Sequence, residues 1–95
     1  MSPEETERLR INLLIQFKNV DPMPLGIRDL IFGAKNAGFF AHQAPAETTA
    51  QLSAELDHLA DPDLKFIAVA GDELRTVRKW KIAKGGRDYL ERQGF

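Results

Sequence analysis

The stretch KFIAVAGDELRTVRKWKI, residues 65–82, decides the fold of this chain. Its two runs, residues 65–70 and 76–82, are rich in the β-branched and aromatic side chains that favour strands. The Gly-Asp-Glu segment between them, residues 71–73, has the composition of a turn. The stretch therefore predicts a β-hairpin. Because side chains alternate between the two faces of a strand, we expect Trp80 to anchor the hairpin in the core rather than to stack on a ligand.

Three segments before the hairpin carry apolar residues at helical spacing. The first begins at Ser2, where serine, proline and then glutamate form a helix-start pattern, and the prolines of residues 21–24 end it. Gly38 ends the second, because glycine readily takes the left-handed conformation that closes helices. These signals predict helices at about residues 3–19, 25–37 and 46–60, and a short last helix over residues 87–92 that follows a turn at Gly85–Gly86.

The length and composition are those of one globular domain. The chain has 95 residues, of which 43% are hydrophobic and 28% charged, so it can build a single core. It contains no cysteine, which excludes disulfides, thiolate zinc sites and cysteine nucleophiles. We therefore expect one domain over residues 1–95 of the α+β class, mostly helical, with three helices followed by a β-hairpin and a short C-terminal helix.

The first residues and the hydropathy pattern bear on location. Residues 1–5 are acidic where a secretory signal would be basic, and no apolar window approaches the length of a membrane span. The sequence therefore predicts a cytoplasmic protein with no membrane partner.

Charge is distributed unevenly along the chain. Residues 1–64 hold five Lys/Arg against ten Asp/Glu and carry a net charge of −5, whereas residues 65–95 hold eight against four and carry +4. The whole chain has a net charge of only −1. A polyanionic partner is therefore expected to meet the C-terminal third.

The segment WKIAKGGRDYLE, residues 80–91, is similar to the ending of winged helix domains, in which an aromatic, an aliphatic, a glycine, a second aromatic and a leucine recur at fixed places. The order of three helices, hairpin and helix also resembles this superfamily. Residues 24–25 stand where a short extended segment leads into the second helix of such domains. The matching places in the ending are occupied by Ile82, Gly86, Tyr89 and Leu90.

Two features depart from the winged helix pattern. Ala83 stands where the family usually has a capping threonine, so the last helix needs another cap or frays, at a cost of about 1 kcal/mol. The connection over residues 38–45 is longer than the three or four residues typical of a DNA-binding helix-turn-helix. The relation between the second and third helices therefore does not follow from the resemblance.

The resemblance implies binding of double-stranded DNA, with the third helix in the major groove and the hairpin, called the wing, along the backbone or in the minor groove. The outward face of the third helix carries Glu47, Asp57 and Asp61, which repel phosphates. On and beside the wing, cationic side chains are concentrated. We therefore expect a transcription-regulatory protein whose wing supplies most of the contact, through Arg75, Arg78, Lys79, Lys81, Lys84 and Arg87, with Gln51 and Ser53 as the possible readers of base edges.

An alternative is a winged helix that binds protein and no nucleic acid. Ile11 and Ile15 lie outside the apolar stripe of the first helix, and Phe32 lies outside that of the second. Exposed apolar patches on small domains often mark interfaces, which favours a homodimer or another protein partner. The competing interpretation is that the last helix or the long connection covers these side chains.

Catalysis and metal binding have little support in the sequence. Asp57, His58 and Asp61 are the closest approach to a metal cluster, but His58 points about 100° away from the two carboxylates on a helix. The serines and Tyr89 have no adjacent histidine to activate them. We therefore expect no enzymatic activity, no metal and no cofactor, and we interpret the segment around Gly85–Gly86 as a turn rather than a phosphate loop.

Overall fold

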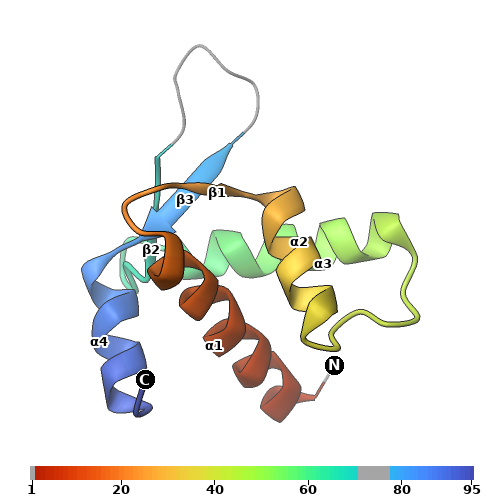
Figure 1. Cartoon of the computed structure of the whole chain (residues 1–95), viewed down its shortest axis with the longest axis horizontal. Helices are drawn as coiled ribbons and strands as arrows, with labels where there is room; N and C mark the ends of the chain where they lie inside the picture. The colour runs from red at the N-terminus through yellow and green to blue at the C-terminus, as the bar shows by residue number, and fades with distance from the viewer. Residues whose placement is uncertain (1, 71–77) are drawn as a thin grey trace.

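Four helices and a three-stranded antiparallel sheet make up residues 2–70 and 78–95, the part of the chain that the computed structural model describes (Figure 1). This confirms an α+β architecture dominated by helices. Within these residues no helix is long and apolar enough to cross a membrane. The elements are α1 (Pro3–Val20), β1 (Leu25–Gly26), α2 (Ile27–Asn36), α3 (Pro45–Leu59), β2 (Ile67–Val69), β3 (Lys79–Ile82) and α4 (Lys84–Arg92).

Helix α1 begins as its sequence predicts. The Ser2 side chain accepts a hydrogen bond from the Glu5 N–H, with an N···O distance of 3.2 Å, and a proline occupies the first turn. A side-chain oxygen at this place satisfies one of the N–H groups that the start of a helix leaves without a partner. The buried face of α1 packs against both α2 and β3 and is formed by Leu9, Leu13, Leu14 and Phe17.

Helix α2 is shorter than expected, because its first two predicted residues form strand β1 instead. Leu25 and Gly26 pair with Trp80 and Lys79 of β3. The expectation of a helix from residue 25 was therefore wrong: backbone hydrogen bonding to a distant strand overrides the helical pattern. Gly26 caps α2 in an extended conformation, and its N–H donates to the Asp29 carboxylate at 3.3 Å.

The end of α2 is closed by a Schellman motif, as the glycine predicted. Gly38 has a φ of +94°, and its N–H donates to the carbonyl of Lys35 at 3.0 Å. The next residue, Phe39, donates to the carbonyl of Ala34, also at 3.0 Å. This pair of bonds is the one that defines the motif. It turns the chain into residues 37–44, the long connection to α3.

Helix α3 and the sheet form the rest of the core. Leu52, Leu56 and Leu59 of α3 are fully buried, as predicted. In the sheet, β3 lies between β1 and β2, and Trp80 is only 5% exposed, which confirms it as the core anchor. The strands are shorter than the predicted runs of residues 65–70 and 76–82. The predicted turn and residues 74–77, Arg75 among them, lie outside the described residues.

Helix α4 begins at Lys84 rather than at Arg87, so Gly85 and Gly86 lie in its first turn and the predicted loop turn was wrong. A Cβ atom on Gly85 or Gly86 would collide with the carbonyl oxygens of Leu64 and Phe66, respectively. The two glycines therefore allow α4 to pack directly on the backbone that leads into β2.

The N-cap of α4, Ala83, has no side-chain hydrogen bond, as its sequence predicted, and backbone carbonyls replace the missing cap. The Gly85 N–H donates to the Lys65 carbonyl at 3.1 Å. The Ala83 N–H donates to the Phe66 carbonyl at 2.9 Å. The start of α4 is thus held by the segment before β2 rather than by a threonine.

Candidate nucleic-acid interface

The outward face of β3 carries two lysines. Lys79 and Lys81 are exposed, whereas Trp80 and Ile82 between and beyond them are buried, so the strand alternates as its period of two requires. The strand register places Gly26 opposite Lys79 and Ala68 opposite Lys81. Both opposing residues are small, so no bulky side chain stands opposite the lysines on this face of the sheet. The charge of the face comes from the two lysines. Within residues 2–70 and 78–95, neither lysine takes part in an ion pair.

Arg78, just before β3, is engaged with the acidic helix. Its Nη1 atom lies 3.5 Å from Oδ1 of Asp57 on α3, and both side chains are more than half exposed, at 61% and 64%. An exposed pair of this kind contributes little to stability, about 0–1 kcal/mol. It places a carboxylate next to Arg78, where that carboxylate competes with any phosphate for the guanidinium.

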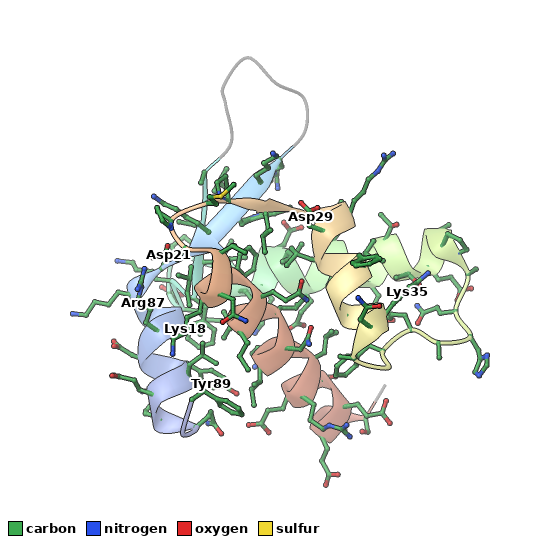
Figure 2. The ribbon with its side chains drawn as sticks, viewed as in Figure 1. Lys18, Asp21, Asp29, Lys35, Arg87 and Tyr89 are labelled. Atoms are coloured by element: carbon green, nitrogen blue, oxygen red, sulfur yellow. The ribbon has the colours of Figure 1, made fainter. Side chains whose placement is uncertain are left out.

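At the start of α4, one predicted cation is exposed and one is paired. Lys84 is exposed in the first turn of the helix. The Arg87 guanidinium donates to the carboxylate of Asp21, at the end of α1, and the two side chains point toward one another in Figure 2. This contact joins α4 to the end of α1 and neutralises part of the charge that the sequence assigned to DNA binding.

The exposed face of α3 is acidic, as the sequence predicts. Glu47 and Asp57 are exposed on this helix, and Asp61, which is also exposed, lies just beyond its end. Ser53 is half-buried, and so is Gln51, whose side-chain oxygen accepts a hydrogen bond from Gln43 of the preceding connection at 2.9 Å. The two predicted readers of base edges are therefore less accessible than the carboxylates around them.

The structure adds Arg28, which sequence reasoning missed, to the cationic face. It is an exposed residue in the first turn of α2, and together with Gly26, Ile27, Asp29 and Lys79 it lines a shallow hollow of about 530 Å³. The only sequence signal for this juxtaposition was the extended segment expected before the second helix. That segment brings the start of α2 next to β3 because it pairs with β3 as β1.

The apolar residues predicted to form an interface do not all lie together. Ile11 and Ile15 are half-buried, pack against the edge of the core and line one shallow hollow on α1. Phe32 is 70% exposed on α2 and is not part of that hollow.

Tyr89 couples α4 to α1 on another side of the molecule. Its hydroxyl donates to a carboxylate oxygen of Glu7 at 3.3 Å, and its ring lies 5.1 Å from that of Phe66. Burial raises the pKa of Tyr89, and the negative charge of Glu7 raises it further. A tyrosine with a raised pKa stays protonated at neutral pH. The contact is therefore a structural link between helices rather than an activated nucleophile.

The acidic residues proposed as a weak metal cluster have other partners. Asp57 contacts Arg78, and a carboxylate oxygen of Asp61 accepts a hydrogen bond from the Asp63 N–H at 2.8 Å. Across the described ranges, no group of three or more His, Asp or Glu side chains is placed to hold a metal ion.

Comparison of the chain with protein-family models, with curated proteins and with solved structures yields no match. Its function is therefore inferred from its own surfaces.

Proposed function

We propose that this chain is a winged helix protein that binds double-stranded DNA in transcription regulation, chiefly through contact between its wing and the DNA backbone. The observation that carries the proposal is the outward face of β3. Two lysines, Lys79 and Lys81, stand there on the same side of the strand, with small residues opposite and no ion pair among the described residues.

The arrangement of the sheet supports the winged helix assignment. Of residues 24–25, where the resemblance implies an extended segment before the second helix, Leu25 belongs to strand β1, which pairs with β3. The three helices α1, α2 and α3 precede the antiparallel pair β2–β3, and α4 follows it (Figure 1). This is the order of elements in the superfamily.

The cations of the sheet face suit phosphates better than base edges. Successive phosphates of a DNA strand are spaced along an extended path, and a strand presents every second side chain on the same face about 6.6 Å apart. Lysine is a flexible point charge with no planar fork for recognising a guanine. Arg28 lines a hollow with Lys79 at one end of β3, and Lys84 is exposed in the first turn of α4, which follows the other end. Binding of this kind is salt-dependent and nearly independent of DNA sequence.

Helix α3 takes little part in this mode of binding. The helix contains no lysine or arginine, and its exposed carboxylates would face phosphates if it entered the major groove. The long connection over residues 37–44 also separates it from α2 by more than a helix-turn-helix normally allows.

The proposal is tested by removing the two lysines of the sheet face. We expect Lys79→Gln combined with Lys81→Gln to weaken binding to short duplexes of unrelated sequence about tenfold at low salt, because two phosphate contacts are lost. Fluorescence anisotropy with labelled duplexes measures this affinity.

The matched control is Lys35→Gln combined with Arg92→Gln, which removes the same charge from the last turns of α2 and α4. Lys35 lies toward the other end of α2 from Asp29 (Figure 2). Equal loss of affinity in both double variants would mean that net charge, and not the sheet face, determines binding. The absence of duplex binding by the unmodified chain at low salt would refute the proposal.

A further inference from the structure

The outward side of α1 carries a stripe of residues with the spacing of a coiled coil. Its positions are separated by four, three, four and three residues, so they lie along one line of the helix. At 100° per residue this line is opposite to the buried Leu13 and Phe17. The stripe consists of Glu4, Arg8, Ile11, Ile15 and Lys18.

Two phenylalanines, Phe39 and Phe95, flank the apolar middle of the stripe. Each directly follows the glycine of a Schellman motif that ends a helix. Gly94 has a φ of +88° and closes α4 with a second Schellman motif, in which Phe95 donates to the Leu90 carbonyl at 2.9 Å. Phe39 holds the equivalent place after Gly38 at the end of α2. Both phenylalanines, one from each side, line a shallow hollow of about 320 Å³ together with Ile11 and Ile15.

This hollow has the composition of a protein interface. Four large apolar side chains line it, and Phe95 remains 54% exposed. Arg8 and Asn12 also line it. Apolar side chains combined with a few polar ones are typical of a surface that binds another protein.

The charges at the two ends of α1 identify the partner that fits. The first turn is acidic, with Glu4 and Glu5, and the last turn is basic, with Lys18. Glu4 lies seven residues before Ile11, and Lys18 lies seven residues after it. A two-fold axis beside Ile11 therefore places Lys18 of each copy next to Glu4 of the other. A parallel arrangement would instead place like charges together.

We propose that a second copy of this chain docks on the hollow, with the two α1 helices antiparallel and Ile11 beside the two-fold axis. The interface is isologous, so each apolar side chain and each charge is used twice. The docking face lies at the edge of the core, and none of the residues that line it belongs to the sheet. It is therefore compatible with an exposed cationic face of β3 and is independent of whether that face binds DNA.

The orientation is tested by cysteine cross-linking, which is simple in a chain that contains no cysteine. Glu4→Cys and Lys18→Cys chains are mixed in equal amounts and oxidised mildly. We expect mixed disulfide dimers to exceed either homodimer several-fold, because a disulfide requires Cβ atoms about 4 Å apart. Lys35→Cys, an exposed position outside the hollow, is the control and should give only background cross-linking.

Sedimentation velocity of the full chain over a range of concentrations tests the dimer itself. Glu4→Lys combined with Glu5→Lys should weaken self-association about tenfold, Lys18→Glu should also weaken it, and mixing these two chains should restore it as a heterodimer. All three positions are exposed, so the fold should be retained. A chain that stays monomeric throughout, or a predominance of Lys18→Cys homodimers, would overturn the proposal.

Discussion

Helix α3 and the residue before β3 are joined by the contact between Asp57 and Arg78, yet the outward faces of α3 and β3 carry opposite charge. The helix presents carboxylates, and the strand presents Lys79 and Lys81. In a winged helix the resemblance would assign base recognition to the helix and a supporting role to the strand. The order of elements along the chain therefore does not decide which surface suits a polyanion. That depends on the charges that each element exposes.

Side chains of β3 are alternately exposed and buried, and the buried Trp80 anchors the strand so that Lys79 and Lys81 face outward. We expect Trp80→Ala to lower the free energy of unfolding by about 3–5 kcal/mol, because a large buried side chain is lost and a cavity remains. Urea unfolding measures the change. Lys81→Ala on the opposite face of the same strand should change it by less than about 0.5 kcal/mol. If the two variants lost similar free energy of unfolding, the buried face of β3 would not be the one that anchors the strand.

Helices α1 and α3, the antiparallel strands β2 and β3 and the buried Trp80 followed from the sequence, because their apolar spacing repeats over enough residues to define a period. Strand β1 did not, because two residues have no period and their partners lie about 54 positions away in the chain. The start of α4 was missed for a different reason. Gly85 and Gly86 have the composition of a turn, but they are needed where helix and backbone come into contact.

The cationic residues of the candidate site were predicted from composition, but their pairing was not. Arg78 meets a carboxylate 21 positions away, and Arg87 meets one 66 positions away. Arg28 joins the site only because β1 places it there. Long-range neighbours of charged side chains depend on the packed fold, and the local pattern of the sequence contains no signal for them.

The contact between Asp57 and Arg78 provides a second test of the roles of the acidic and cationic surfaces. We expect Asp57→Asn to strengthen duplex binding about threefold at low salt, because it frees Arg78 and removes a negative charge. Glu91→Gln, an exposed acid on α4, should have a smaller effect on the same anisotropy titration. If Asp57→Asn weakens binding, the acidic face of α3 takes part in it, and the assignment of binding to the outward face of β3 alone is wrong.

The smallest effect is expected on α3 itself. Because Ser53 is half-buried, and because the proposed mode of binding keeps α3 out of the groove, Ser53→Ala should change affinity by less than about twofold and should leave the relative affinities for different duplex sequences unchanged. Competition between duplexes of differing sequence measures this. A change in sequence preference would restore α3 as the reading helix.

The strongest test of contact between the outward face of β3 and DNA phosphates is the salt dependence of duplex binding. The slope of log K against log salt should fall by about two when Lys79 and Lys81 are both replaced by glutamine, because two fewer phosphates are neutralised. The Lys35→Gln and Arg92→Gln control should keep the slope of the unmodified chain. The same slope for all three proteins would contradict binding through the outward face of β3.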